Sequence, residues 1–340
     1  ARENDAINDA WISDRDRYSF EGWQSKDRIT KPLIKKDGQW TEVSWDKALQ
    51  FTINGLKNIE DKTQIGTICS PSVTTEEMYL LQKVMRGIGS DNIDHRLRQS
   101  DFSVEDQEPV LPGLAISLAD VSAQQAILLI GSNVRKEQPI MGHHIRQASL
   151  NGAKISTVNP VSYDFNFKVA HEFTIAPAEL FKELKALAKA VQEESSEEAP
   201  EGLSALVASV KAADDHKQCV AELSSAENSM LILGTLAQAM PHYSAIRMLA
   251  SFIADATQST LNYLTPGANT SGAYLSGVLP YTGDKQGLNT QAMLADNLKS
   301  YVLYGIEAER DCDNPLEALK AFKNAEFVVS MNAYVTDTMK

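Results

Sequence analysis

The sequence predicts an α/β protein in which parallel strands form sheets that carry helices on both faces. The stretch 125–160 shows the unit of that fold, because it reads as a strand, a glycine turn, a helix and a second strand. The same order recurs in units whose first strands begin at Ile65, Met230 and Tyr301. The strands are continuous apolar runs such as 126–130, which are typical of strands buried on both faces. Strand–helix–strand repeats of this kind place successive strands parallel to one another.

Residues 1–31 are polar and irregular, and a hairpin and a helix follow them. The dipeptide Asp37-Gly38 separates two strand-like runs, 33–36 and 40–43, and Asp-Gly favours the type I′ turn of a hairpin. Ser44 is suited to cap the next helix. The apolar side chains of that helix lie along one side: Trp45, Leu49, Ile53 and Leu56. The aromatic anchors of the first stretch are Trp11, Tyr18, Phe20 and Trp23.

Strands of the parallel units are predicted at 65–69, 126–130, 154–158, 230–233, 260–264, 301–304 and 327–331. Thr74 and Glu77 have the spacing of a capping box for the first of the helices between them. The second helix begins at Pro139 and stops at Asn151-Gly152, and the others are predicted at 241–256 and 315–323. The predicted buried faces are Leu81, Val84 and Met85 in the first helix and Met141, Ile145 and Ala148 in the second.

A helical stretch at 177–226 interrupts the repeats. It consists of amphipathic helices joined by the acidic linker 193–202, and we expect it to be an insertion on the edge of the sheet. The chain then divides into 1–60 (irregular stretch, hairpin and first helix), 61–176 (first α/β units), 177–226 (insertion) and 227–340 (further α/β units). Because the chain begins at Ala1 and ends just after a predicted strand, we expect it to be a segment of a longer polypeptide.

Composition excludes several classes of function. The net charge of −13 argues against a nucleic-acid or anionic-membrane surface, since both need a basic footprint. No apolar run approaches the roughly 20 residues of a membrane span. Cys69, Cys219 and Cys312 are far apart, which indicates a reducing compartment and argues against a compact thiolate cluster.

The turns after the strands are the candidate ligand sites, because parallel sheets bind ligands at the carboxyl ends of their strands. These turns are Ser70-Pro71, Gly131-Ser132-Asn133, Gly234-Thr235 and Gly305-Ile306. Glycine there allows close approach of an anion, and a helix start behind it favours a phosphate. None of the turns is a complete phosphate-binding motif, so the alternative is that these glycines only make tight turns.

Other polar clusters give weaker signals. The run 267–272 is either a ligand loop or a folded loop that packs on another domain. His143 and His144 are adjacent on a helix and cannot share a metal. Acidic residues from Asp94 to Glu108 are expected to be solvated, and no GxSxG motif indicates a serine hydrolase.

Longer strings resemble a known family. KPLIKKDGQWTEVSWDKAL at 31–49 and GSNVRKEQPIMGHHIRQASLNGAKISTVNP at 131–160 resemble the molybdopterin oxidoreductases. ENDAINDAWISDRDRYSFEG, HRLRQSDFS, GANTSGAYLSGVLP and YVLYGIEAERDCDNP are similar to one branch, the large iron–sulfur (G) subunits of bacterial NADH–quinone oxidoreductases. The resemblance covers essentially the whole chain, and it implies the fold of that family.

The resemblance also implies where a cofactor is lost. Active members place a cysteine, selenocysteine or serine metal ligand at the position of Ser100, a few residues after a motif that matches 92–94. Their nucleotide-recognising Asp-Pro-Arg matches Asn159-Pro160-Val161, which removes the carboxylate for the guanine edge and the arginine. We therefore expect no catalytic residue and no cofactor in this segment, with vestigial positions at Ser100, Gly131, Asn133, Asn159 and Val161.

Iron–sulfur clusters are expected only upstream in the full-length subunit. Some members carry a further cluster whose last cysteine precedes an Asp-Arg pair. Here Ser13 precedes Asp14-Arg15, and a serine replaces a soft thiolate poorly, so we expect no metal at this position.

The resemblance leads to a scaffold hypothesis. The segment is expected to hold together the peripheral electron-transfer arm of an NADH–quinone oxidoreductase of the respiratory chain, to contact its other subunits and to be inactive alone. Localisation is then cytoplasmic, peripheral on the inner membrane, with no nucleic acid and no membrane insertion. The alternatives are a functional molybdopterin-binding oxidoreductase domain and an independent nucleotide-binding module. The expected contact surface is 1–31 and 269–279, with Ile12, Tyr18, Tyr274, Leu275 and Val278.

Overall fold

The structure, a computed structural model, describes residues 3–4, 6–8, 10–107, 111–195, 199–336 and 339. The chain forms two compact units. Unit 1 comprises Ala1–Tyr18, Ser100–Gln107 and Pro112–Thr265, and unit 2 comprises Ser19–Gln99, Glu108–Leu111 and Pro266–Lys340. Unit 2 is thus assembled from distant parts of the chain, whereas the ranges predicted from the sequence were consecutive.

Unit 1 contains a five-stranded parallel sheet in the order β7-β6-β5-β8-β9. The strands are β5 Ala126–Ile130, β6 Lys154–Asn159, β7 His171–Thr174, β8 Ser229–Leu233 and β9 Thr260–Tyr263. Ala126 pairs with Lys154 in parallel register, which confirms the strand–helix–strand unit on which the prediction rested. The prediction missed β7, an edge strand with alternating partial exposure.

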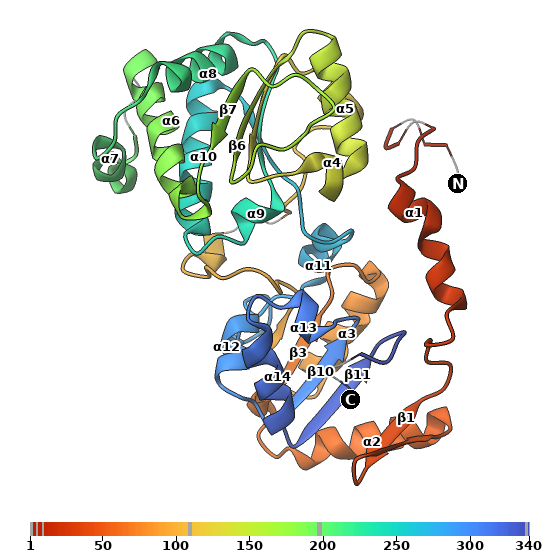
Figure 1. The fold of residues 1–340 in the computed structure, drawn as a ribbon. Coiled ribbons are helices and arrows are strands. Elements are labelled where there is room, and N and C mark those ends of the chain that lie inside the picture. The colour runs from red at the N-terminus through yellow and green to blue at the C-terminus, as the bar shows by residue number, and fades with distance from the viewer. Residues whose placement is uncertain are drawn as a thin grey trace. The chain divides into compact units, whose positions relative to one another are not determined.

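Helices cover both faces of this sheet (Figure 1). Leu128 and Ile130 of β5 belong to a core formed with α6, α8 and α10, while Ile127 and Leu129 belong to a second core formed with α5. This is the alternation that a strand buried on both faces requires. The helices are α5 Pro139–Leu150, α6 Leu180–Ser195, α8 Asp214–Ser225 and α10 Tyr243–Thr257.

The stretch 177–226 covers a face of the sheet rather than its edge. Its helices are α6, α7 (Glu201–Ala208) and α8, which connect β7 to β8. Leu184 and Val191 are fully buried in the same core as Leu128. An amphipathic helix buries its apolar stripe on a sheet face, because a sheet edge offers unpaired backbone groups instead.

Unit 2 contains a four-stranded parallel sheet in the order β11-β10-β3-β4. The strands are β3 Ile65–Cys69, β4 Ile93–Asp94, β10 Ser300–Tyr304 and β11 Phe327–Met331. Tyr301 and Leu303 pack with α12 and α14 on one face, and Val302 packs with α3 and α11 on the other. The helices are α3 Thr75–Gly87, α11 Thr270–Ser276, α12 Thr290–Ala295 and α14 Pro315–Asn324.

The predicted hairpin and first helix are confirmed in unit 2. Strands β1 (Leu33–Lys36) and β2 (Gln39–Glu42) pair antiparallel around Asp37 and Gly38, whose φ values are 50° and 77°. Positive φ at both positions defines the type I′ turn. Ser44 caps α2 (Trp45–Asn58) by accepting a hydrogen bond from the backbone N–H of Lys47.

The predicted buried face of α3 was partly wrong. Its capping box between Thr74 and Glu77 is confirmed. The helix buries Met78, Gln82 and Met85, whereas Val84 is 57% exposed. The remaining α-helices are α1 Asp14–Tyr18, α4 Val134–Glu137, α9 Thr235–Gln238 and α13 Ala308–Asp311. No helix of the described ranges has the length and apolar character that a membrane crossing demands.

Candidate functional site

The candidate ligand site of unit 1 is the point where the strand order of its parallel sheet reverses. In open parallel sheets, ligands bind outside the carboxyl ends of the strands at that point. In unit 1 the chain runs from β5 to β6 and β7 on one side, then returns to β8 and β9 on the other. The reversal therefore lies between β5 and β8. The turns that follow these two strands begin at Gly131 and Gly234.

These two turns pack directly on each other. A Cβ atom at Gly234 would lie 2.3 Å from the Gly131 carbonyl oxygen, and one at Gly131 would lie 2.6 Å from the Ala237 nitrogen. The Leu236 N–H donates to the same Gly131 oxygen at 3.1 Å. The glycines therefore serve contact between segments of the chain itself. Helices α4 and α9 behind them have four residues each, too short for a strong dipole.

Asn159 at the end of β6 faces the turn after β5. The backbone N–H of Ser132 donates to Asn159 Oδ1 at 2.8 Å, and Asn159 is only 2% exposed. This bond fixes the orientation of the amide, because only the oxygen can accept. Among the described residues, Asn159 Nδ2 is then a buried donor without a partner, and the Ser132 hydroxyl nearby also has none.

The unpartnered amide nitrogen of Asn159 does not complement the N–H donors of a guanine. The recognition edge of guanine presents N–H donors, so it needs an acceptor such as a carboxylate. The free group of Asn159 is itself a donor, so the two would oppose each other. Val161 is 54% exposed and supplies no cation, and Asn133, ahead of α4, makes no capping bond with its side chain.

Ser100 has a structural partner. Its Oγ donates to the Ala239 carbonyl at 3.0 Å. Next to it, Asp101 accepts hydrogen bonds from the backbone N–H of Ser244 at 2.9 Å and from Ser103. Partial burial opposes ionisation of Asp101, but these hydrogen bonds hold its pKa below the usual range. The segment 100–103 is therefore hydrogen-bonded to α10 and to Ala239, which follows α9. The expectation that Asp101 is solvated was wrong.

Ser13 belongs to a local helix start. It is 7% exposed, its Oγ donates to Asp16 Oδ2 at 2.5 Å, and the Asp16 N–H donates back to it. This is the hydrogen-bonding pattern of a residue that begins a helix, here α1. Across the part of the chain that the structure describes, no three His, Cys, Asp or Glu side chains gather in a way that could hold a metal ion.

In unit 2, the turn that follows β3 is covered by a later segment of the chain. The Asn269 N–H donates to the Pro71 carbonyl at 2.8 Å, and Asn269 Nδ2 donates to the Val73 carbonyl at 2.8 Å. A Cβ at Gly267 would lie 2.6 Å from Pro71. The run 267–272 is therefore a packing loop over the turn after β3, within its own unit.

The predicted contact surface in 269–279 is partly wrong. Val278 is 0% exposed and belongs to the core around β3, because α11 packs on α3. Tyr274 is half-buried with its ring against His95 at 5.0 Å, so only Leu275, at 69% exposure, remains a free apolar side chain there. In the other predicted stretch, Tyr18 is 58% exposed.

A buried polar cluster follows β4, and the sequence did not reveal it. Arg96 forms a two-point ion pair with Asp94, Nε to Oδ1 at 2.9 Å and Nη2 to Oδ2 at 3.0 Å. The Thr290 N–H also donates to Asp94. Burial opposes the charge of Asp94, but Arg96 holds the pKa of the carboxyl below its usual value. The expectation of a solvated Asp94 was therefore wrong.

His95 lies in the same cluster. Its Nδ1 lies 2.8 Å from the Val278 carbonyl oxygen and must donate to it, so Nε2 is a buried acceptor without a partner among the described residues. Burial lowers the pKa of His95 to about 4. The imidazole is therefore neutral at physiological pH, and it ties the end of β4 to the segment after α11.

The three cysteine thiols and the phenol of Tyr304 are not activated. Burial raises the pKa of each of the thiols Cys69, Cys219 and Cys312 to about 12. Burial, reinforced by a hydrogen bond to Glu77, likewise raises the pKa of Tyr304 to about 12. None of these groups is an activated nucleophile, since nucleophilic cysteines need a lowered pKa.

The structure defines an α/β protein with parallel sheets flanked by helices, in which the turns after β5 and β8 pack on each other. The sequence model described as "Molybdopterin oxidoreductase" matches residues 28–340. The chain belongs to the molybdopterin oxidoreductase family.

Curated relatives fall into two groups. The chain is 34% identical over 158 residues to the alpha subunit of the F420-dependent formate dehydrogenase of Methanocaldococcus jannaschii, covering 45% of this chain and 23% of that protein. It is 29% identical over 194 residues to the NADH-quinone oxidoreductase G subunit of Rickettsia felis, covering 54% of this chain and 28% of that protein. The matches thus span about a quarter of the length of these relatives.

Among solved structures, acetylene hydratase from Pelobacter acetylenicus has a similar fold. The TM-score is 0.73 at 14% sequence identity, with 99% of this chain and 57% of that chain covered. The likeness confirms the predicted fold class, an α/β architecture of parallel sheets with flanking helices.

Proposed function

We propose that this chain is a structural segment of an NADH–quinone oxidoreductase, within its G subunit, and carries no redox centre itself. The observation that carries the proposal is the orientation of Asn159. Ser132 holds its amide oxygen, which leaves a donor where a guanine edge needs an acceptor. The packing of Gly131 against the turn at Gly234 supports the same interpretation, because it fills the crevice with backbone.

The role in a complex is supported by relatives named as the G subunit of NADH-quinone oxidoreductase. In that role the chain positions neighbouring subunits of the peripheral electron-transfer arm, on the cytoplasmic side of the inner membrane. The iron–sulfur clusters belong to the upstream part of the full-length subunit. Electron transfer then passes through that part.

The second candidate is a functional molybdopterin oxidoreductase domain. It is favoured by the 34% identity to the alpha subunit of an F420-dependent formate dehydrogenase. Under this alternative, Ser100 would have to exchange its bond to the Ala239 carbonyl for a metal.

Metal analysis separates the two candidates. The chain expressed with ample molybdate and then desalted should contain far less than one molybdenum per chain, because its nucleotide contacts are missing. Near-stoichiometric molybdenum contradicts the scaffold role. In the native cell, the chain should co-fractionate with NADH–quinone oxidoreductase activity; co-fractionation with formate oxidation instead supports the alternative.

A further inference from the structure

Helix α2 leaves several of its apolar side chains exposed in the described structure, although Leu56 packs against the core around β3. The helix has 14 residues, and none of them is buried. Trp45, Leu49 and Ile53 are 69%, 54% and 45% exposed. Its contacts with the sheet include Phe51, whose ring lies 5.7 Å from that of Phe327 on β11, and Gly55, which lies against the same Phe327 ring. Of the apolar side chains of α2, Phe51 lines the cleft described next, whereas Trp45, Leu49 and Ile53 do not.

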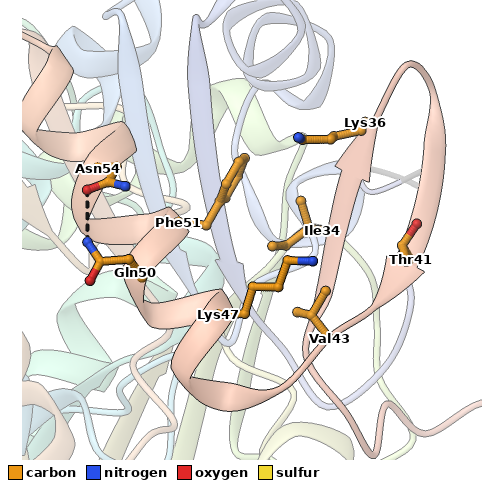
Figure 2. Close-up of a pocket in the computed structure, with 8 residues that line it drawn as sticks. All are labelled: Ile34, Lys36, Thr41, Val43, Lys47, Gln50, Phe51 and Asn54. Atoms are coloured by element: carbon orange, nitrogen blue, oxygen red, sulfur yellow. Dashed lines mark hydrogen bonds between the residues drawn. The ribbon is translucent and has the colours of Figure 1, made fainter.

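A cleft separates α2 from the hairpin β1–β2. It has a volume of about 410 Å³ and an apolar floor of Ile34, Val43 and Phe51 (Figure 2). The hairpin buries only Ile34, so it stands off the helix instead of packing against it. A two-stranded hairpin is marginal alone, and an apolar group in the cleft would join it to α2.

The cleft is positively charged in an acidic protein. Lys36 enters it from the hairpin and Lys47 from α2, and Figure 2 shows both side chains at the cleft. Within the described ranges neither amine has a carboxylate partner, whereas neighbouring Lys31 is paired with Glu42 at 2.9 Å. The stretch 31–57 holds five lysines and three acidic residues, against a net charge of −13 for the chain.

An amide pair in the cleft favours a polypeptide. Gln50 Nε2 donates to Asn54 Oδ1 at 2.9 Å, as the dashed line in Figure 2 shows. This leaves the Gln50 carbonyl as a free acceptor and the Asn54 NH₂ as a free donor, side by side on α2. Together they complement the N–H and C=O of an extended peptide backbone.

We propose that this cleft binds an acidic peptide segment of a partner protein, with a large apolar side chain flanked by carboxylates. The apolar side chain lies on Ile34 and Phe51. The carboxylates pair with Lys36 and Lys47, and the backbone bonds to the amide pair. This inference rests on the proposed scaffold role, for which it names the kind of partner and the surface.

The test is selection from a displayed library of random heptapeptides on the immobilised 340-residue chain. Enriched peptides should carry an aromatic or long aliphatic residue next to Asp or Glu. Lys36→Glu with Lys47→Glu should lower their enrichment at least about tenfold, because both charges of the cleft are reversed. Both lysines are exposed, so the variant should keep the circular dichroism spectrum of the parent.

The matched control is Lys320→Glu with Lys323→Glu on α14, which changes the net charge equally at exposed positions of the same unit. Enrichment should survive in this control. Three results overturn the proposal: no enrichment, enriched peptides without acidic residues, or equal loss in both variants.

This outcome is separable from that of the proposed function. Co-fractionation with NADH–quinone oxidoreductase activity does not depend on the peptide selection. If co-fractionation is lost but peptides are still selected, the proposed role in the complex is contradicted and the proposed peptide site stands. If co-fractionation is intact but no peptides are selected, the role in the complex stands and the peptide site is contradicted.

Discussion

A single hydrogen bond decides how the residue at 159 can be used. Asparagine and aspartate have almost the same shape, and both can accept from the N–H of Ser132. With aspartate the second oxygen would remain an acceptor, whereas Asn159 presents Nδ2. The chemical character of the strand end is therefore reversed by one atom, without any change in fold. A single hydrogen bond also determines the state of Ser100, whose hydroxyl donates its proton to the Ala239 carbonyl.

His95 should make stability depend on pH. In the unfolded chain the imidazole takes up a proton as the pH falls below about 6.5, but the folded imidazole does so only near pH 4. Between these values the unfolded state binds more protons, so the free energy of unfolding should fall with falling pH, by up to about 3 kcal/mol. Urea denaturation from pH 7 to pH 4 measures this slope.

The variant His95→Asn keeps a donor for the Val278 carbonyl and loses the titrating group. Its slope over the same pH range should therefore be flatter. The remaining slope includes Asp94, whose lowered pKa acts in the same direction as the pH falls. His242→Asn, at an exposed ring whose centroid lies 5.7 Å from that of Phe181, is the control. An unchanged slope in His95→Asn assigns the pH effect to other groups.

Gly234 should tolerate no side chain. Gly234→Ala places a Cβ 2.3 Å from the Gly131 oxygen and 2.4 Å from Ser132 Cβ, so the two turns must separate. We expect the free energy of unfolding to fall by about 1–3 kcal/mol or more. Gly202→Ala in α7 meets nothing within 4 Å and should leave stability unchanged or raise it by up to about 1 kcal/mol. Equal stability of the two variants in urea contradicts direct packing of the turns.

At the scale of elements, the contribution of a helix cap to the global free energy of unfolding depends on how much the helix buries. Both α2 and α3 begin with a hydroxyl that accepts from the backbone of the first turn. Helix α3 buries Met78 and Met85, whereas α2 buries nothing. Thr74→Ala should therefore lower the global free energy of unfolding by about 1 kcal/mol. Ser44→Ala should mainly speed local amide exchange in α2, with a smaller global effect.

Amide hydrogen exchange combined with urea denaturation distinguishes these effects. The expected pattern is faster exchange across Trp45–Asn58 in Ser44→Ala, at nearly parental global stability. If Ser44→Ala instead lowers global stability as much as Thr74→Ala, then α2 is an integral part of the folding unit.

The elements that the sequence predicted well are those with strong local signals. Strands such as 126–130 are continuous apolar runs that end at glycine, and the hairpin depends on one dipeptide. The two-residue strand β4 and the four-residue strand β7 carry no such pattern. The helices of 177–226 were recognised as amphipathic, but the face that they cover depends on strands elsewhere in the chain, such as β5.

In the candidate site, too, local sequence features were predictable and tertiary contacts were not. The assignment of Ser100, Asn159 and Val161 as vestigial site positions rests on matching to the family motif, which needs only local order, and it stays a prediction. The orientation of the Asn159 amide and the contact of Gly131 with Gly234 are set by tertiary structure. A sequence pattern therefore cannot predict whether a ligand can reach such positions.

At the scale of the whole molecule, the two units differ in how the chain builds them. In unit 2, β3 pairs with β10, so strands more than 200 positions apart lie side by side. Nothing local in 300–304 states which sheet it joins, because any buried parallel strand has the same apolar pattern. The sequence therefore indicated parallel sheets but arranged the domains consecutively.

The contrast leads to a prediction about independent folding. Residues 112–265 contain all five strands of the unit 1 sheet and both of its cores, with Val121 and Leu264 near their limits. Produced alone, this range should give a cooperative urea transition and an α/β circular dichroism spectrum, because its parallel strands keep their neighbours and covering helices. Residues 19–99 alone should remain unfolded, since β3 loses its partner β10 and the core residues Leu303 and Phe322. Mixing in residues 266–340 should restore structure to that range. If 112–265 is disordered while 19–99 folds, the stability of the molecule comes from unit 2, and unit 1 folds only upon it.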